Sequence, residues 1–555
     1  MSTVIGLAFG NTSSSIGFVN KEGKVDIIAN QDGDRAIPSA ISYIHGDEYH
    51  GLQAKNQLIR NPRNTVAYFR DFIGQSFSDI DPTYTHASAH PIEKDGRTTF
   101  ELKTQGDDAE AESVTIEHIA ARHLTRLRES AVDFLGKPVD GAVIAVPTDF
   151  GDDRRNALTK VAQDAGIKVL QLVNEPTAAL LAHVSAQQQA SGNPVEDKIY
   201  VVADFGGTRS DGAVIASRGG IFTILATQHD FELGGYKLDE ALSQFVAKNF
   251  EKEHGVDPMK ETRAIAKLMA ESEVARKTLS NTTSSNFAIE SLASGIDYHT
   301  TINRLRFELA ARPVFNRFVS FVENLVKKAE LDVLDVDEVL LVGGVSFTPK
   351  IASSLSAVFD EKTVITAPTT DTKALNPNEL IARGAAIQAS LIANYDDEEI
   401  AESLQAIVTV APHLQAPIGI KVNEDSFVTV IDIDTALPIR KTHVFDTDSD
   451  NVLVGVYEGQ SEIVTKTLEK PAKEEKDQDD DESDWSDDDD EPEEVREKVV
   501  KPGKLLAEAG LKGITKGSKV EVVLSVTKEL KIQVAAREVK NGGVAVRGVT
   551  AAASV

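Results

Sequence analysis

The chain has 555 residues, no cysteine and a formal net charge of −29. This length allows several domains with full cores, and the lack of cysteine excludes disulfides and thiolate metal sites. The acidic balance argues against direct binding of nucleic acid. No apolar run reaches membrane-spanning length and the first residues lack a signal-peptide pattern, so we expect a cytoplasmic protein without a membrane partner.

The charge is concentrated in one segment. Residues 474–494 contain 15 Asp or Glu and one Lys, so this block alone carries −14. Such low hydrophobicity and self-repulsion predict a disordered insertion, which we place at 470–495. Ser483 and Ser486 lie among these acids and are either kinase targets or simple solvated serines.

Residues 4–19 predict a strand, a turn at Gly10, Asn11 and Thr12, and a returning strand. A glycine-rich turn between buried strands exposes backbone N–H groups and suits a phosphate, although an ordinary hairpin has the same pattern.

The pattern recurs about 200 residues later. An apolar strand from Ile199 to Ala203 leads to Asp204, then to a turn at Gly206, Gly207 and Thr208, and Gly212 to Ala216 predicts the returning strand. A third apolar strand, within 338–345, runs into Gly343 and Gly344. Two such hairpins predict two related lobes that share one cleft.

Between the hairpins, residues 115–135 and 152–166 predict helices that flank a strand at Gly141 to Val146, an alternation typical of an α/β sheet. Residues 261–279 predict another helix. Beyond residue 409, alternating apolar residues predict strands over 409–465 and 500–550, including those around Phe427, Val452, Lys519 and Leu530.

These turns, in this order, resemble the DnaK-type heat-shock chaperone family. Further matching motifs are Val146-Pro147, Val173-Asn174-Glu175-Pro176-Thr177-Ala178-Ala179, Leu233-Gly234-Gly235, Arg306-Phe307-Glu308, Arg383-Gly384-Ala385-Ala386, Ser449-Asp450-Asn451 and Val456-Tyr457-Glu458-Gly459. The resemblance implies an actin-like α/β nucleotide-binding domain with lobe I at 1–196 and lobe II at 197–392. It also implies a linker at 393–408 and, at 409–550, a short all-β sandwich related to the family's peptide-binding domain. We expect no helical lid after it, and a weakened linker in which only Leu404, Ile407 and Val408 are apolar.

The resemblance further implies that ATP is the ligand. The matching phosphate-side residues are Gly10, Asn11, Thr12, Glu175, Asp204, Gly206, Gly207, Thr208, Gly234, Gly235, Gly343 and Gly344. Family members hold adenosine with residues that match Glu273, Arg276, Lys277 and Ser280. From the residues alone, a solvated, salt-bridged helix face is the favoured explanation of these four, and only the resemblance points to adenosine.

Several positions depart from the family pattern. Ala8 stands where the family has an aspartate near the metal, and Asn11 where it has threonine. Arg70 aligns with the catalytic lysine, and a planar guanidinium does not replace a compact ammonium. Thr208 and Arg209 replace a glycine and a threonine, while Val345 and Phe347 replace a serine and an arginine. We therefore expect ATP binding with weak or absent magnesium, no catalytic residue and little or no turnover.

The departures resemble those of the atypical DnaK-type chaperones of the fungal ribosome-associated complex, which pair with the J-domain protein zuotin. This implies a non-cycling co-chaperone that forms a heterodimer, reaches the ribosome through that partner, and assists nascent chains by stimulating a second, active DnaK-type chaperone. The alternatives are an ATP-hydrolysing peptide-binding chaperone and a nucleotide-exchange factor of the large heat-shock type. We expect the partner to pair with exposed edges at Val520 to Val526 and Leu530 to Val534, or transient clients to use that groove.

Overall fold

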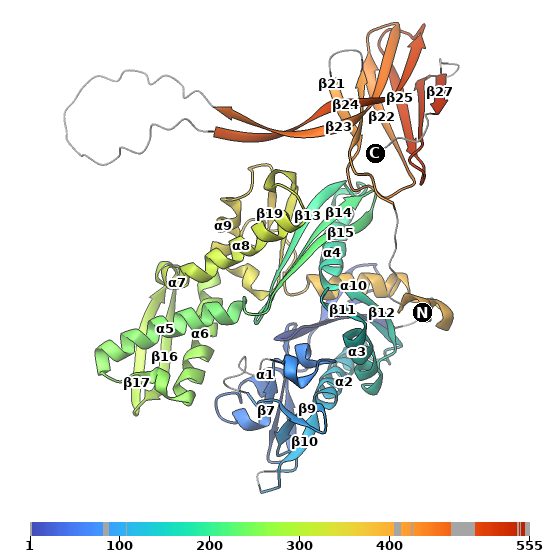
Figure 1. The fold of residues 1–555 in the computed structure, drawn as a ribbon. Helices are drawn as coiled ribbons and strands as arrows, with labels where there is room; N and C mark the ends of the chain where they lie inside the picture. Colours follow the sequence, from blue (N-terminus) through green and yellow to red (C-terminus); the bar gives the residue numbers. More distant parts are fainter. Residues whose placement is uncertain are drawn as a thin grey trace, which may run out of the picture. The chain divides into compact units, whose positions relative to one another are not determined.

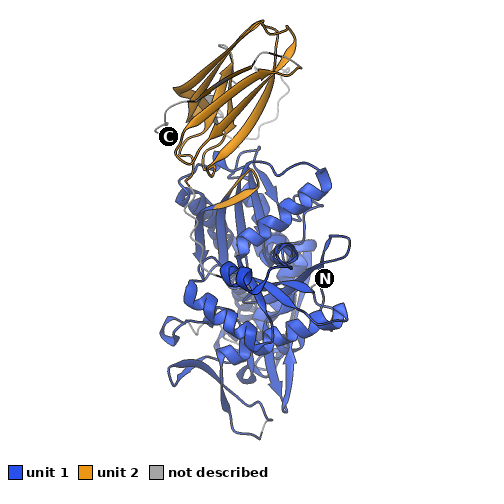
Figure 2. Ribbon diagram, turned by 90° about the vertical axis from the view of Figure 1, so that its right-hand side faces the viewer, with its two compact units in different colours: residues 1–215, 224–408 blue, residues 216–223, 409–555 orange. Residues whose placement is uncertain are grey.

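The computed structural model describes residues 3–80, 88–106, 108–404, 412–422, 426–467, 494–540, 543 and 545–549. The chain divides into two compact units, one formed by residues 1–215 and 224–408 and the other by residues 216–223 and 409–555 (Figure 2). Nearly all of the predicted acidic insertion, with Ser483 and Ser486, lies outside the described residues, but its last residues, Glu494 and Val495, belong to strand β24.

Two sheets with the same strand order form the centre of the first unit (Figure 1). One runs β12-β11-β1-β2-β3, with β4 beside β2, and the other runs β19-β18-β13-β14-β15. The strands of the first are β1 (Val4–Phe9), β2 (Ser13–Val19), β3 (Val25–Ile28), β4 (Ile37–Pro38), β11 (Gly141–Val146) and β12 (Val169–Asn174). Those of the second are β13 (Lys198–Phe205), β14 (Ser210–Arg218), β15 (Ile221–Asp230), β18 (Glu338–Val342) and β19 (Val364–Thr366).

The two sheets also share their parallel pairing. β1 pairs in parallel with β11, with Val4 opposite Gly141, and β13 pairs in parallel with β18, with Tyr200 opposite Glu338. In each sheet the first strand of the glycine-turn hairpin, β1 or β13, therefore pairs with a parallel strand that comes much later in the chain, β11 or β18. This confirms the prediction of two related lobes from the repeated strand–glycine–strand pattern.

Small sheets and helices complete the first unit. The small sheets contain β5 (Ala40–Ile44), β6 (Asp47–His50) and β7 (Thr65–Ala67); β8 (Ile92–Lys94), β9 (Arg97–Leu102) and β10 (Glu112–Thr115); and β16 (Ser284–Ala293) with β17 (Ile296–Asn303). The helices are α1 (Gly51–Lys55), α2 (Ile116–Leu135), α3 (Asp152–Asp164), α4 (Glu175–Ser191), α5 (Gly235–His254), α6 (Thr262–Asn281), α7 (Arg304–Ala310), α8 (Arg312–Lys328), α9 (Pro349–Ser356), α10 (Leu380–Leu391) and α11 (Asp397–Ser403). None of the helices in the described part of the chain is long and apolar enough to cross a membrane.

The predicted helices occur where the sequence placed them. Helix α2 begins after Thr115, whose hydroxyl accepts from the backbone N–H of His118, and ends at Gly136 with φ of 67°. Both are ordinary end signals, because a side-chain oxygen caps free N–H groups and glycine adopts the left-handed conformation without strain. Helix α3 ends at Asp164, two residues before the predicted end, since Gly166 already has φ of 71°.

Helix α10 packs so closely on α4 and β1 that glycine is required at both contacts. A Cβ atom on Gly384 would stand 1.7 Å from the carbonyl oxygen of Ala178 in α4, and one on Gly6 of β1 would stand 2.1 Å from the backbone nitrogen of Ala386. Backbone atoms cannot rotate away as a side chain can. The Arg383-Gly384-Ala385-Ala386 motif is thus explained by the crossing of α10 with α4 and β1.

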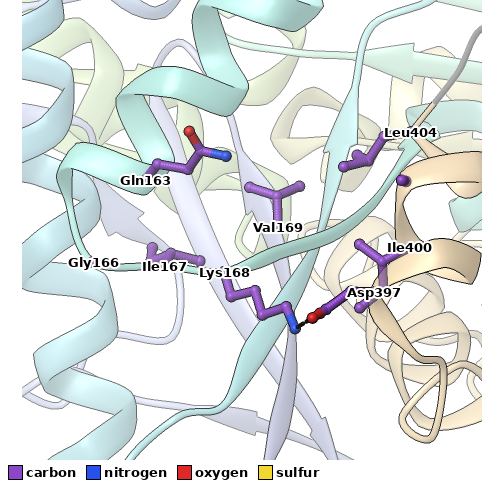
Figure 3. Close-up of a pocket in the computed structure, with 9 residues that line it drawn as sticks. Gln163, Gly166, Ile167, Lys168, Val169, Asp397, Ile400 and Leu404 are labelled. Atoms are coloured by element: carbon purple, nitrogen blue, oxygen red, sulfur yellow. Dashed lines mark hydrogen bonds and ion pairs between the residues drawn. The ribbon is translucent and has the colours of Figure 1, made fainter.

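The described part of the predicted linker, residues 393–404, contains helix α11 (Asp397–Ser403). Asp396 caps α11 through a capping box with Glu399, and Ile400 is buried. Ser403 Oγ donates to the carbonyl of Leu170, and Lys168 Nζ pairs with Asp397 Oδ1 at 2.8 Å (Figure 3). Helix α11 therefore packs beside β12. Ile407 and Val408 lie outside the described residues.

The second unit carries two four-stranded sheets, β21-β20-β23-β24 and β22-β25-β26-β27. Their strands are β20 (Ile418–Val422), β21 (Ser426–Ile431), β22 (Ile439–Thr447), β23 (Asn451–Thr467), β24 (Glu494–Lys512), β25 (Ser518–Val526), β26 (Ile532–Glu538) and β27 (Ala545–Val549). Buried residues of both sheets, such as Ile420, Val454, Val522 and Val534, form one core, which confirms the prediction of an all-β sandwich.

The predicted edges of this sandwich are wrong. Val520 to Val526 belong to β25, which pairs with both β22 and β26, and β26 pairs with both β25 and β27. Both strands are interior, because their backbone groups are used on both sides. In this sheet, as far as it is described, the outer strands are β22 and β27. The high apolar content of these two strands thus reflects their burial inside the sheet and not an exposed edge.

Candidate functional site

The two predicted glycine turns have the same geometry and lie against each other. In the first, the backbone N–H of Gly10 donates to the carbonyl of Ser13 at 3.1 Å, and in the second that of Gly206 donates to the carbonyl of Arg209 at 3.0 Å. A Cβ atom on Gly207 would stand 2.5 Å from Thr12 Cγ2. The turns are joined by a hydrogen bond from Asn11 Nδ2 to Thr208 Oγ1 at 3.0 Å.

Two further glycine pairs close around the second turn. Gly235 and Tyr236 donate backbone N–H groups to the carbonyls of Gly206 and Gly207, at 3.0 and 2.8 Å. Gly343 has φ of 82°, and a Cβ atom there would stand 2.4 Å from Asp204 Oδ1. A Cβ atom on Gly344, in contrast, would approach only the side chain of Asn378, at 3.2 Å. The structure thus brings together four glycine segments that the sequence had spread over more than half of the chain.

Glu175 and Asp204 are the two predicted carboxylates of this region. Glu175 is the first residue of α4 and is 4% exposed, while Asp204 lies near the end of β13. Burial raises the pKa of Glu175 to about 8, despite the opposing charge of Arg70. Burial, with the added charge of Asp211, raises the pKa of Asp204 to about 7. Both groups therefore titrate near neutral pH.

Arg70 is 4% exposed and is held by protein acceptors. Its Nη1 donates to Glu175 Oε1 at 3.0 Å and to the carbonyl of Phe9 at 3.3 Å, and its Nε donates to Asp71 Oδ1 at 2.9 Å. Burial lowers the pKa of Arg70, but the charges of Asp71 and Glu175 outweigh it, so the guanidinium is charged and fixed. A fixed fork of this kind cannot move freely to an attacking water.

Arg209 forms the centre of a second buried network. Its Nη2 donates to Asp149 Oδ1 at 2.8 Å and to Asp211 Oδ1, and it lies 3.5 Å from His229 Nδ1. Its guanidinium also lies over the ring of Phe231, with 4.5 Å between the guanidinium carbon and the ring centroid. Arg154 holds the other oxygen of Asp149 at 3.1 Å. This network joins the turn of the second hairpin to the loop after β11 in the first lobe.

The same network determines whether this region can bind magnesium, the ion that the family pattern implies. Among the described residues, Asp149, Asp211 and His229 are the group whose ligand atoms lie close enough, within 4.8 Å of one another, to hold a metal ion. All three contact Nη2 of Arg209. With a guanidinium in that position and Ala8 in place of the family's aspartate, the residues present do not fit a divalent ion.

The four predicted adenosine residues lie on α6 and are engaged in different ways. Arg276 is buried, forms a bidentate pair with Asp239, and lies 3.1 Å from the position of a Cβ atom on Gly235. Glu273 pairs with Lys277 at 2.7 Å, as the i,i+4 spacing predicts, and also with Lys55 of α1 at 2.7 Å. Ser280 Oγ donates to the carbonyl of Arg276. Arg276 therefore reaches the glycine segments, whereas Glu273 bridges to the first lobe.

Sequence reasoning missed the acidic partners of the arginines. Asp211 could have been found, because it lies only two residues after Arg209, near the start of β14. Asp149, His229, Asp239 and Lys55 come from separate elements, and no spacing in the sequence connects them with the turns.

Two cavities lie away from the glycine turns. One, of about 430 Å³, is lined by Ile167, Val169, Ile400 and Leu404 with the Lys168–Asp397 pair at its rim (Figure 3). The other, of about 350 Å³, lies between α5 and the start of α8, beside Phe245 and Pro313. Neither contains a predicted site residue.

The sequence of the chain is similar to those of several known proteins. The family model for "Hsp70 protein" matches residues 4–472. The ribosome-associated complex subunit SSZ1 of Saccharomyces cerevisiae is 48% identical over 99% of both chains. A heat shock protein 70 homolog of Schizosaccharomyces pombe is 44% identical over 99% of this chain and 96% of its own length. A heat shock 70 kDa protein of Emericella nidulans is 33% identical over 83% of this chain and 69% of its own length.

The family model matches most of the chain, and the first unit has the repeated sheets and glycine turns, and the second the β-sandwich, that the sequence predicted. The chain belongs to the Hsp70 protein family.

Proposed function

We propose that this chain is a non-cycling Hsp70 co-chaperone that binds ATP without significant hydrolysis and acts as a subunit of a ribosome-associated complex. Hsp70 proteins bind adenine nucleotides, and the glycine segments around Asp204 and Arg276 supply the backbone N–H groups and cations that such a ligand needs. The proposed ligand residues are the sixteen predicted from the sequence.

The observation that carries the proposal is the engagement of Arg70. A residue that aligns with the family's catalytic lysine donates instead to Glu175, Asp71 and the carbonyl of Phe9. Phosphoryl transfer relies on positioned charge and a positioned nucleophile. A cation that is already bound by three protein groups is poorly suited to positioning water, so rate is lost while binding groups remain.

The similarity to SSZ1 supports the second half of the proposal. That protein is named as a subunit of a ribosome-associated complex and aligns with this chain from end to end. We infer a stable heterodimer with a zuotin-like J-domain protein, contact with the ribosome through that partner, and stimulation of a second, active Hsp70 that handles nascent chains. No direct role for nucleic acid is proposed, because the excess charge is negative.

Measuring ATP affinity and single-turnover hydrolysis on the same preparation of the full chain tests the nucleotide half. We expect saturable binding with no hydrolysis above the buffer rate. Hydrolysis at the rate of an ordinary Hsp70 would instead support the ATP-hydrolysing alternative, and absence of binding would refute the nucleotide site.

A matched pair of variants controls the assignment of the site. Gly343→Ala adds a Cβ atom 2.4 Å from Asp204 Oδ1, and Gly136→Ala adds one with nothing within 4 Å; both positions have positive φ. Gly343 has ψ of 166°, which is strained for any other residue, whereas Gly136 has ψ of 21°, in the ordinary left-handed region. We expect only the variant at Gly343 to lose ATP affinity, and thermal unfolding of both variants separates lost binding from lost folding.

Sedimentation of cell extract through a sucrose gradient tests the partner half. We expect the chain to migrate with ribosomes when the J-domain partner is present and to leave that fraction when the partner is depleted. Migration with ribosomes after depletion would place the ribosome contact on this chain. Stimulated release of nucleotide from a second Hsp70, without the J-domain partner, would favour the exchange-factor alternative.

A further inference from the structure

The position of Arg209 addresses a question that the proposed function leaves open, namely which cation accompanies the nucleotide. Its side chain is 4% exposed and comes from the turn that also contains Gly206 and Gly207. Its Nη2 contacts Asp149, Asp211 and His229, the three described residues whose ligand atoms lie close enough together to hold a metal ion. A guanidinium nitrogen therefore occupies the place that the geometry would otherwise offer to a metal ion.

The electrostatics of the group agree with this assignment. Burial raises the pKa of the Asp211 carboxyl, but Arg209 and His229 outweigh it and hold that pKa below its ordinary value. Burial lowers the pKa of Arg209, but the charges of Asp211, Asp71 and Asp149 have a larger effect. The pKa of Arg209 is therefore raised above its ordinary value. The Asp211 carboxylate is therefore ionised and already neutralised by a protein cation.

Part of the guanidinium remains available to a ligand. Nε and Nη1 of Arg209 are buried and make no hydrogen bond to any residue that the structure describes, although Nη1 lies 3.5 Å from Asp71 Oδ1. An arginine fork can donate to carboxylates on one side and to phosphate oxygens on another. The neighbouring turn supplies backbone N–H groups of the kind that bind phosphate.

We propose that Arg209 is the permanent cation of this phosphate site, so that the chain binds ATP as the metal-free anion. The inference rests on the proposed ATP binding. It accounts for Ala8 and the fixed Arg70 as well, because a site with its own cation does not need carboxylates that organise the water shell of magnesium. It also gives a specificity, since a metal-bound nucleotide brings a second positive charge to a position where Arg209 already stands.

Titration of the full chain with ATP in excess magnesium and in excess chelator is the first test. We expect the apparent dissociation constant to be about tenfold or more larger in excess magnesium than in chelator, because magnesium converts ATP into the complex that the site disfavours. Equal affinity in the two buffers, or weaker binding in chelator, would overturn the inference while leaving ATP binding intact. Absence of binding in both buffers would refute the proposed function itself, so the two failures are distinguishable.

Binding of Mn²⁺ to nucleotide-free protein, followed by electron paramagnetic resonance, is the second test. Wild-type protein and Arg154→Ala should show only the weak background of the acidic segment 474–494, which is common to all variants. Arg209→Ala should add one tight site, and Arg209→Ala with Asp211→Asn should lose it again. Arg154 is a matched control, because it pairs with the same Asp149 but, among the described residues, makes no hydrogen bond or ion pair with Asp211 or His229.

A tight Mn²⁺ site in the wild-type protein would contradict the proposal, as would its absence from a folded Arg209→Ala variant. Thermal unfolding of each variant establishes that it is folded. The chelator titration needs no variant, so it decides the question even if the loss of Arg209 prevents folding.

Discussion

Nη1 of Arg70 donates to Oε1 of Glu175 at 3.0 Å, and both side chains are almost fully buried. Because burial raises the pKa of Glu175 to about 8, this contact at neutral pH is mainly a hydrogen bond from the Arg70 guanidinium to a carboxylic acid, and breaking it would leave buried polar groups without a partner. The pair is therefore expected to persist when nucleotide binds, and its persistence separates binding from turnover.

Restoring turnover should require three changes rather than two. Ala8→Asp with Arg70→Lys returns a carboxylate and a mobile ammonium, but Arg209 still fills the group formed by Asp149, Asp211 and His229. We expect single-turnover hydrolysis to stay at background in the double variant and to become measurable when Arg209→Thr is added. The double variant is the control, and hydrolysis in it equal to that of the triple variant would show that Arg209 is no obstacle.

The affinity for ATP should fall as pH rises. The pKa of Asp204 is raised to about 7, so its carboxyl is largely neutral below that pH and negative above it, within the proposed phosphate site. We expect several-fold weaker binding at about pH 8 than at about pH 6, and a smaller change in Asp204→Asn. ATP titrations at constant ionic strength measure this, and an unchanged pH dependence in the variant would mean that another group is responsible.

The bridge between Lys55 and Glu273 should stabilise the protein in a pH-dependent way. Burial raises the pKa of Glu273, but Lys55 and Lys277 outweigh it and lower the value from 4.5 to about 2. A lowered carboxyl pKa means stability that is present above the unfolded value and lost as pH falls toward the folded one. We expect Glu273→Gln to lower the free energy of unfolding by about 1 kcal/mol at neutral pH.

The comparison of wild type and this variant by chemical denaturation, repeated downward from pH 5, measures the effect. Their difference should shrink as pH falls through the window between 4.5 and about 2. A difference that is constant over the range in which both remain folded would assign the effect to lost packing instead of lost charge.

Gly384→Ala should be strongly destabilising. The added Cβ atom would stand 1.7 Å from the carbonyl oxygen of Ala178, a backbone atom that can move only with α4. Overpacking of this kind costs about 3 kcal/mol. Gly151→Ala is the control, because nothing lies within 4 Å of its Cβ position, and thermal unfolding should place it near the wild type.

Hydrogen exchange should locate the J-domain partner on an outer strand. β25 and β26 are paired on both sides and should exchange slowly in the isolated chain, with or without the partner. In its described surroundings β22 pairs with β25 alone and includes Val444, which is 46% exposed, so an extended partner segment can add to it. We expect new protection over 439–447 on complex formation. Protection confined to other parts of the chain would refute this mode of binding.

The sequence predicts those features of the fold and the site that depend on residues within one short segment, and it fails for features that depend on contacts between distant segments. The turn at Gly206 and Gly207 is a local feature, since glycines between two apolar runs are sufficient to indicate it, and its recurrence at Gly10 predicts the second lobe. The interior position of Val520 to Val526 is not local. The same alternating pattern describes an edge strand and a central strand, and only the pairing with β22 and β26 separates them.

The sequence by itself determined the family, the repeated hairpins, the helix on which Glu273 and Arg276 lie, and the positions where chemistry departs from the family pattern. These follow from residue type and short spacing, which act within one element. Only the tertiary structure decided what the departures do. Arg70 meets Glu175 across 105 residues, and Arg209 meets Asp149 across 60, because the packing of separate elements brings these hydrogen-bonding side chains together where water is excluded.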